Sequence, residues 1–204
     1  MTGDNTVTSL RPNSLSISEY ADWLARSGTS VLPGTGGTYW VGYETGALVR
    51  LPTFDLSRPQ PGEIQRVLWQ GRVGVAAYLL SPDDQHPANA WLYVCRDRSY
   101  SVENLSKPAR RDIHRSQRNL RFGLVDWPTL LAKGLEAYAD TRRRVGLSDG
   151  TRNNFMRRFE TFSSNPAHHV FGAWNNDALV AFMTLIIVDS WVAIEGSFSA
   201  DAFL

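Results

Sequence analysis

Three apolar runs near the end of the sequence predict a three-stranded meander. They cover 170–174, 179–188 and 191–198 and are rich in Val, Ile, Phe and Trp, which suit a pleated, half-buried surface. The Asn-Asn-Asp at 175–177 and the Asp-Ser at 189–190 separate the runs, and such residues favour turns because their side chains bond to the local backbone. The middle run, LVAFMTLIIV, predicts a central strand with both faces covered.

Apolar side chains at helical spacing predict four helices. Ser16 and Glu19 have the spacing of a capping box and Gly28 is a natural stop, so the first helix is expected from about 17 to 27. A second is expected over 107–121. The third begins at Asp126-Trp127-Pro128, with Leu131, Leu135 and Tyr138 directed inward. The fourth follows Thr151 and carries a stripe of apolar side chains at Phe155, Met156, Phe159 and Phe162. We interpret this aromatic stripe as core rather than as a cofactor site.

Shorter elements alternate in the first half of the chain. Strands are expected at 39–43, 47–51, 73–80 and 90–96, a short helix at 63–69, and loops at 57–62 and 81–89. The whole pattern predicts an α+β fold with helices packed on an antiparallel sheet. The expected divisions are a flexible tail over 1–15, a first lobe over 16–104 and a second domain over 105–204.

The composition is that of a globular protein with a substantial core. It is 43% hydrophobic and 20% charged with a net charge of +1, so the molecule as a whole shows no nucleic-acid or membrane signal. Cys95 is the single cysteine, which excludes an internal disulfide and fits a reducing compartment. The sequence shows no charged-then-apolar signal pattern near its first residue and no apolar run of about 18 residues. We therefore expect a cytoplasmic protein without a membrane span.

Two features of the sequence have the composition of phosphate sites. Pro33-Gly34-Thr35-Gly36-Gly37 is Gly-rich, but no Gly-Lys-Ser/Thr follows it, and a turn between strands is favoured. The helix over 107–121 is strongly basic, with Asp112 as its only acid; its basic residues are Lys107, Arg110, Arg111, Arg115, Arg118 and Arg121. This helix is either a solvated face, with a narrow buried stripe at Ala109, Ile113, Ser116 and Leu120, or an anion site for a polyphosphate or RNA backbone.

Other chemistries have little support in the sequence. The dipole at the end of a helix is by itself sufficient to account for the three arginines at 142–144. The four His and one Cys show no metal-ligand spacing, and the adjacent His168 and His169 point to opposite faces of a strand. A Gly-x-Ser-x-Gly nucleophile motif is absent.

The second half resembles the FemAB-like branch of the GNAT acyltransferase superfamily. Leu105-Ser106-Lys107 with the basic helix is similar to its opening motif, and the segment from Tyr138 to Gly146 is similar to its "Y-x-x-T-x-x-R-x-G" segment. Phe171-Gly172-Ala173-Trp174, followed by the run from Leu179 to Phe182, is similar to its hairpin. The resemblance rests on the order of these segments over about 105–204 and implies a GNAT-like mixed sheet, with a degenerate first lobe before it.

The resemblance implies acyl transfer to an amine, such as a peptide or a cell-envelope or polysaccharide precursor. The donor would be acyl-CoA or acetyl-CoA, or an aminoacyl-tRNA, with no metal. Glu195 matches the strand position of the family's base, although it could instead form a structural ion pair with an arginine. Ser197 is a candidate for contact with substrate or, more simply, a strand surface residue. Arg111, Arg115, Arg118 and Arg143 are the candidates for substrate or anion binding.

The sequence departs from the family at the pyrophosphate loop. That loop should follow the fourth strand, but the chain ends at Leu204, and the similar Gly71-Arg72-Val73-Gly74 runs into a strand instead of a helix. We therefore expect either a part of a longer enzyme or a shortened homologue. Two functions stay open: N-acyl transfer, and a non-catalytic module that binds RNA or another polyanion through the Lys107–Arg121 helix.

Overall fold

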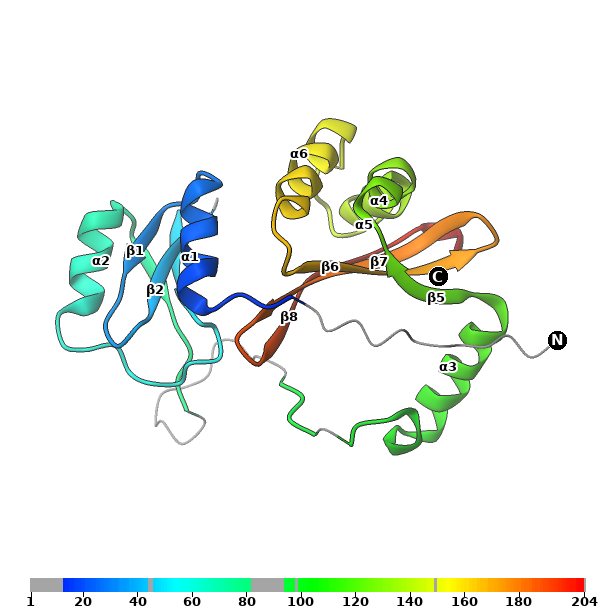
Figure 1. The fold of residues 1–204 in the computed structure, drawn as a ribbon, viewed down its shortest axis with the longest axis horizontal. Helices are drawn as coiled ribbons and strands as arrows, with labels where there is room; N and C mark the ends of the chain where they lie inside the picture. Colours follow the sequence, from blue (N-terminus) through cyan, green and yellow to red (C-terminus); the bar gives the residue numbers. More distant parts are fainter. Residues whose placement is uncertain (1–12, 44–45, 82–93, 98, 149, 204) are drawn as a thin grey trace. The chain divides into compact units, whose positions relative to one another are not determined.

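The structure is a computed structural model that describes residues 13–43, 46–81, 94–97, 99–148 and 150–203 (Figure 1). The chain divides into two compact units. Unit 1 comprises Met1–Tyr20, Gly123–Gly172 and Leu179–Leu204, and unit 2 comprises Ala21–Phe122 and Ala173–Ala178. No helix among the described residues is both long and apolar enough to cross a membrane.

The first helix has the predicted cap. Helix α1 spans Ile17–Arg26. The Ser16 hydroxyl accepts a hydrogen bond from the Glu19 backbone N–H, and the Glu19 carboxylate accepts one from the Ser16 N–H at 2.7 Å, so the capping box is confirmed. Most of the expected tail, 1–12, lies outside the described residues, whereas Leu15 forms a parallel bridge with Val188.

Unit 2 holds a four-stranded sheet in the order β1-β2-β3-β4. Its strands are β1 (Val31–Pro33), β2 (Tyr39–Tyr43), β3 (Ala47–Leu51) and β4 (Val75–Ala77), and the helix α2 (Glu63–Gly71) packs against it. The first three strands are antiparallel, and β4 joins β3 in parallel. Trp40, Leu48 and Val67 form its buried core. The helix α3 (Lys107–Asn119) follows a short 3-10 turn (Val102–Asn104).

Two expected strands of the first half differ from the structure. The run at 73–80 forms only the short β4, and Val75 is 57% exposed. β4 is an edge strand of the described sheet and its burial pattern is exposed, half-buried, exposed, so the expected burial is wrong. Of the expected strand at 90–96, residues 94–96 have no strand structure and 90–93 lie outside the described residues, as does most of the loop at 81–89.

The Gly-rich loop is a turn around a buried carboxylate. Gly36 and Gly37 have positive φ angles, which glycine adopts without strain. The Glu63 carboxylate accepts hydrogen bonds from the Thr35 N–H and hydroxyl and from the Trp40 indole at 2.8 Å. The backbone N–H of Thr35 is therefore already used within the chain, and the turn interpretation holds.

The sheet built mainly from unit 1 is the predicted meander extended by one strand. It runs in the order β5-β6-β7-β8, with β5 (Arg121–Val125), β6 (His168–Asn175), β7 (Ala178–Val188) and β8 (Trp191–Ser199). Asn176 and Asp189 turn the chain with positive φ angles. β7 is central as predicted, and from Val180 to Val188 fully buried side chains alternate with half-buried ones, so its second face is covered only in part.

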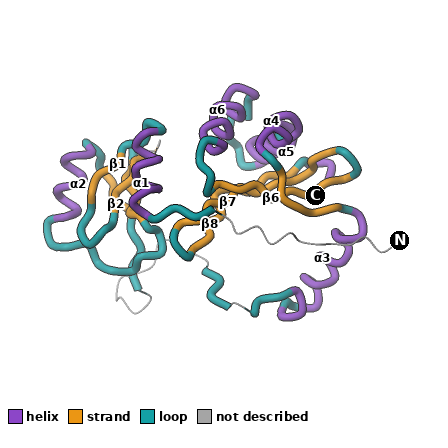
Figure 2. The backbone as a smooth tube through the Cα atoms, in the orientation of Figure 1, coloured by secondary structure: helices purple, strands orange, loops and turns teal. Residues whose placement is uncertain are grey.

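Three helices lie on one face of this sheet (Figure 2). They are α4 (Trp127–Lys133), α5 (Leu135–Arg144) and α6 (Arg152–Ser163), and a 3-10 turn, Asp201–Phe203, follows β8. The expected single helix after Asp126 is two helices divided at Gly134. A Cβ on Gly134 would lie 2.6 Å from the Leu130 side chain, so glycine allows the close approach at this division.

Aromatic rings fill the space between these helices and the sheet. The predicted stripe on α6 is core, since Phe155 and Phe159 are fully buried. Phe159 packs against Tyr138 of α5, Phe182 of β7 and Phe198 of β8, with ring centroids 5.5–5.8 Å apart. The predicted α+β class is confirmed, with helices on a largely antiparallel sheet.

Candidate functional site

A β-bulge sets the direction of the Glu195 side chain. β7 pairs antiparallel with β8, and the pairing passes from Thr184 with Gly196 to Leu185 with Ile194, so Glu195 is the extra residue of β8. A bulge places successive side chains on one face instead of alternating them. Glu195 therefore joins Phe198 on the face that the helices cover, while Ile194 stays on the opposite face and is 66% exposed.

The Glu195 carboxylate is held between two side chains of unit 1. Its Oε2 lies 2.9 Å from Nε2 of His168, which starts β6 and whose side chain is fully buried. Its Oε1 accepts a hydrogen bond of 3.3 Å from the Tyr20 hydroxyl. The side chain of Glu195 remains 19% exposed, although Oε2 itself is buried, and the contacts on both oxygens fix the orientation of the carboxylate. The side chain that contacts Glu195 is thus a histidine, and not an arginine as the sequence alternative expected.

Aromatic packing fixes the imidazole that faces Glu195. The ring of Phe162 stacks on His168 with centroids 4.6 Å apart and planes inclined by 14°. The Tyr20 ring meets the same imidazole edge-on at 6.5 Å. Thr184, fully buried on β7, has a hydroxyl with no hydrogen-bond partner among the described residues. This face therefore carries several polar groups in a mostly apolar surrounding.

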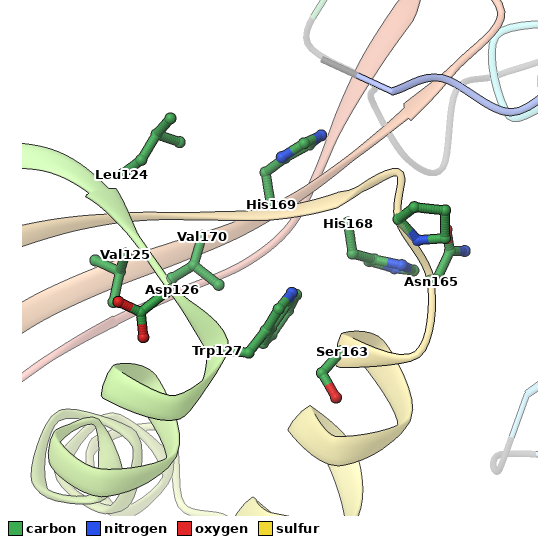
Figure 3. A pocket seen from close by; sticks show the side chains of 10 residues that line it. Leu124, Val125, Asp126, Trp127, Ser163, Asn165, His168, His169 and Val170 are labelled. Atoms are coloured by element: carbon green, nitrogen blue, oxygen red, sulfur yellow. The ribbon is translucent and has the colours of Figure 1, made fainter. Parts of the chain in front are cut away.

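A pocket of about 530 Å³ opens beside His168 (Figure 3). It lies where β5 enters α4 and where α6 leads into β6. Its lining residues are Leu124, Val125, Asp126, Trp127, Ser163, Asn165, Pro166, His168, His169 and Val170. Figure 3 shows the Trp127 and His168 side chains between the start of α4 and the end of α6, and His169 on the other side of β6. The volume is within the range of small-molecule sites.

The polar groups of the pocket differ in their availability. Asp126 caps α4 by accepting a hydrogen bond of 2.7 Å from the Thr129 N–H, and this bond together with the Thr129 side chain lowers the pKa of the carboxyl. By contrast, Nδ2 of the buried Asn165 and Nε2 of His169 have no partner among the described residues. The Asn165 amide and the His169 imidazole therefore keep unused hydrogen-bonding capacity at buried atoms beside the pocket.

Ser197 does not join Glu195. It pairs with Met183 across the β7–β8 ladder, next to the pairing of Phe198 with Phe182 on the helix-covered face. Alternation along the strand then turns Ser197 to the opposite face, where it is exposed. Its expected contact with substrate stays a prediction, and its position is that of a strand surface residue.

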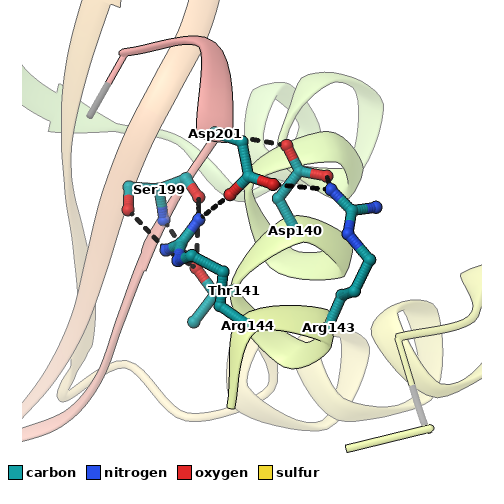
Figure 4. A network of polar contacts seen from close by, with 6 residues as sticks. All are labelled: Asp140, Thr141, Arg143, Arg144, Ser199 and Asp201. Carbon is teal, nitrogen blue, oxygen red and sulfur yellow. Dashed lines mark hydrogen bonds and ion pairs between the residues drawn. The ribbon is translucent and has the colours of Figure 1, made fainter. Parts of the chain in front are cut away.

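Arg143 belongs to a polar network that ties α5 to the end of β8 (Figure 4). Its guanidinium forms ion pairs with Asp140 at 2.6 Å and with Asp201 at 2.7 Å. Arg144 pairs with Asp201 as well and donates to the Ser199 carbonyl at 2.9 Å. The two arginines lower the pKa of Asp201 through these hydrogen bonds. The expected anion-binding role of Arg143 stays a prediction, and in this structure the chain's own carboxylates bind it.

The remaining candidate arginines lie on α3. None of its residues is buried, and the predicted stripe at Ala109, Ile113, Ser116 and Leu120 is only half-buried. Arg111 contacts Asp112 at 3.4 Å, with both side chains largely exposed. Arg115 and Arg118 form no ion pair with any described residue. The expectation of a buried stripe is wrong because little packs on the helix.

Sequence reasoning missed His168, Tyr20 and the bulge. His168 could have been suspected as a polar residue at the start of a buried strand, but its partner depends on a strand register that the sequence does not show.

The segment at Gly71 that resembles a phosphate loop is unsuitable for that role, since the Arg72 and Val73 N–H groups bond to the Trp69 and Leu68 carbonyls. Among the described residues, no cluster of His, Cys, Asp and Glu is suited to a metal ion.

No family model and no curated protein sequence matches this chain. Its fold is similar to solved structures, among them the C-terminal domain (DUF2156) of a protein from Agrobacterium fabrum assigned as a lysylphosphatidylglycerol synthetase. The TM-score is 0.51 and the identity is 12%, so the likeness concerns the fold alone. The match covers 89% of this chain and 64% of the other, so this chain spans less than two thirds of that structure's length.

Proposed function

We propose that this chain is an acyltransferase domain of the FemAB-like GNAT kind, in which Glu195 is the general base. The observation that carries the proposal is the carboxylate on the bulge of β8, oriented by His168 and Tyr20 on a side chain that is 19% exposed. A general base must be held in a fixed position and must be reachable by the proton it removes. Glu195 is held in position by its two partners, and the exposed part of its side chain marks the direction from which an acceptor would approach.

The chemistry follows from the acceptor. An aliphatic ammonium group has a pKa near 10, so at neutral pH it must lose a proton before its nitrogen can attack an acyl carbonyl. Glu195 would take that proton directly or through a water molecule, and the amine would displace the donor's leaving group. Because His168 and Tyr20 contact the two carboxylate oxygens, the side chain is held in one orientation while it does so.

The fold likeness supports the same class of reaction. The name of the similar protein denotes the synthesis of lysylphosphatidylglycerol, in which a lysyl group is joined to another molecule. We extend only the general idea of acyl transfer to this chain. The donor, acyl-CoA or an aminoacyl-tRNA, and the amine acceptor rest on the sequence resemblance. In the two Gly-rich segments the backbone N–H groups of Gly34, Thr35, Arg72 and Val73 already bond within the chain, and we derive no step through a coenzyme A pyrophosphate.

Calorimetric titration of the full chain with acetyl-CoA and, separately, with an aminoacyl-tRNA tests the proposal. We expect saturable binding of one donor, followed by transfer to an amine in an acceptor screen. Glu195→Gln should bind the same donor and lose turnover by about 10²- to 10⁴-fold, the usual contribution of a general base. Glu160→Gln, an exposed carboxylate on α6, is the matched control and should keep the rate. A folded chain that binds neither donor would overturn the proposal.

A second function, polyanion binding by α3, is favoured by one separate observation. Lys107, Arg111, Arg115 and Arg118 follow at intervals of four, four and three residues and therefore form one stripe along the helix. At 100° per residue, this stripe lies opposite the half-buried positions such as Ile113. The stripe is thus directed to solvent, as an RNA-phosphate site requires.

A further inference from the structure

Arg158 on α6 carries a positive charge that the candidate mechanism does not use. Its guanidinium lies over the rings of Phe162 at 5.4 Å and Phe198 at 5.9 Å, measured from Cζ to each ring centroid. The ring of Phe159 is a further neighbour at 5.8 Å. These contacts hold the planar cation in one orientation on the helix-covered face of the sheet.

The donors of this guanidinium are incompletely bonded. Its Nε is buried and has no hydrogen-bond partner among the described residues. No described carboxylate forms an ion pair with Arg158, although the arginines of α5 pair with Asp140 and Asp201. Aromatic faces attract a cation but accept no conventional hydrogen bond, so the in-plane N–H donors retain the capacity to bind oxygen atoms. Such a half-buried, unpaired guanidinium fits a ligand better than it fits a purely structural contact.

The surroundings of Arg158 connect it to the candidate base. Phe162, which lies under the guanidinium, also stacks on His168, and His168 contacts Glu195. Phe198, whose ring also lies beside the guanidinium, comes three residues after Glu195 on β8. Its ring would lie 2.9 Å from a Cβ placed on Gly196, so it packs closely against the strand next to Glu195. The cation and the carboxylate are therefore linked through shared side chains, within unit 1, on the same face of the sheet.

We propose that Arg158 binds an oxyanion group, a carboxylate or a phosphate, on the molecule that Glu195 acts upon. This inference rests on the proposed function for its link to substrate, but the anion site itself does not. The guanidinium fork matches both groups because two parallel N–H donors meet two oxygens. Glu195 is not available as that partner, since both of its oxygens contact other side chains. The substrate would then carry its negative charge at a fixed position relative to the base.

The test is an NMR titration of the arginine Nε–Hε resonances in the full chain. Inorganic phosphate and acetate are added separately at constant ionic strength, and the Arg158 signal is assigned by its loss in Arg158→Lys. We expect this signal to shift saturably with at least one anion, at millimolar concentrations. Movement with acetate alone indicates a carboxylate on the substrate, and movement with phosphate alone indicates a phosphate.

Arg157→Lys is the matched control, because Arg157 is the exposed neighbour on the same helix and its guanidinium donates a hydrogen bond of 3.4 Å to Asn154. It should leave the Arg158 shift unchanged, whereas Arg158→Gln should weaken anion binding at least about tenfold, as judged by anion-dependent thermal stabilisation. Equal movement of all arginine signals, or none at Arg158, would overturn the site. Glu195→Gln should keep the anion-dependent shift of the Arg158 signal. A failed acyltransferase assay would therefore not count against the anion site.

Discussion

His168 and Glu195 come within 2.9 Å of each other, from Nε2 to Oε2, although β7 lies between their strands. Neighbouring strands are spaced by about 4.8 Å, so the two backbones are roughly 10 Å apart and both side chains must reach across the central strand. They can do so only on a shared face. The bulge at Glu195 provides that face, since regular alternation from Phe198 would have turned the carboxylate to the other side.

The contact between these two side chains should be measurable as a coupling energy. His168→Phe keeps a flat ring to stack on Phe162 but removes the nitrogen that faces Glu195. We expect this change to cost about 1–3 kcal/mol, because a partly buried carboxylate loses a partner. Urea unfolding of the two single variants and of the His168→Phe, Glu195→Gln double variant should give a coupling of at least about 0.5 kcal/mol. Strictly additive losses would show that the two groups do not interact.

Gly196 should be required for the bulge that directs Glu195. In Gly196→Ala the new Cβ would lie 2.9 Å from the Phe198 ring, which cannot easily move because Tyr138, Phe159 and Phe182 pack around it. We expect a loss of about 1–3 kcal/mol in the free energy of unfolding, the usual cost of overpacking. Gly123→Ala in the same sheet is the control. No atom lies within 4 Å of its new Cβ, so its stability should change by less than about 0.5 kcal/mol.

The elements of this site could be predicted from the sequence, but its contacts could not. The three strand positions, the turns at Asn176 and Asp189 and the core role of Phe159 follow from local patterns. The meeting of His168 with Glu195 depends on a register shift of one residue, which local periodicity does not contain. The burial of β7 could be predicted only in part: an apolar run shows that a strand can be buried on both faces, whereas alternate side chains of β7 are only half-buried.

Glu63 should make the free energy of unfolding of unit 2 depend on pH in the acidic range. Burial by itself raises the pKa of this carboxyl, but hydrogen bonds from Thr35, Trp40 and Gln60 outweigh it and lower the pKa to about 2. A depressed folded-state pKa contributes stability above the ordinary value of 4.5, and this contribution is lost as the pH falls toward 2. The shift corresponds to on the order of 3 kcal/mol at neutral pH.

Glu63→Gln measures this contribution. In this variant an amide NH₂ group would face N–H donors that in the wild type bond to a carboxylate oxygen. We therefore expect the free energy of unfolding to fall by about 2–3 kcal/mol at pH 7. Denaturant unfolding of both proteins at several pH values should show the difference shrinking below pH 4.5. Glu19→Gln, whose carboxyl is exposed, should show no comparable change in unit 2. A pH-independent gap between wild type and Glu63→Gln would contradict the role assigned to these hydrogen bonds.

The exposed stripe of α3 should bind polyanions through charge alone. Replacing Arg111, Arg115 and Arg118 by Ala removes three cations from a helix in which no residue is buried, so the fold should be retained. Binding of a labelled single-stranded RNA, followed by fluorescence anisotropy over a range of salt concentrations, gives the slope of log K against log salt. Each lost phosphate contact reduces that slope by about 0.7, so the triple variant should lose up to about 2.

A matched variant separates the stripe from general surface charge. Arg152→Ala with Arg157→Ala removes two exposed cations from α6 and should leave the slope nearly unchanged. If both variants weaken RNA equally, the binding reflects the charge of the whole molecule rather than α3. If the triple variant binds as wild type does, the basic face of α3 is solvated surface, because three phosphate contacts cannot be lost without a change in counterion release. Binding that depends on α3 but is abolished at moderate salt would still support a polyanion site, since electrostatic contacts to exposed side chains weaken as salt screens them.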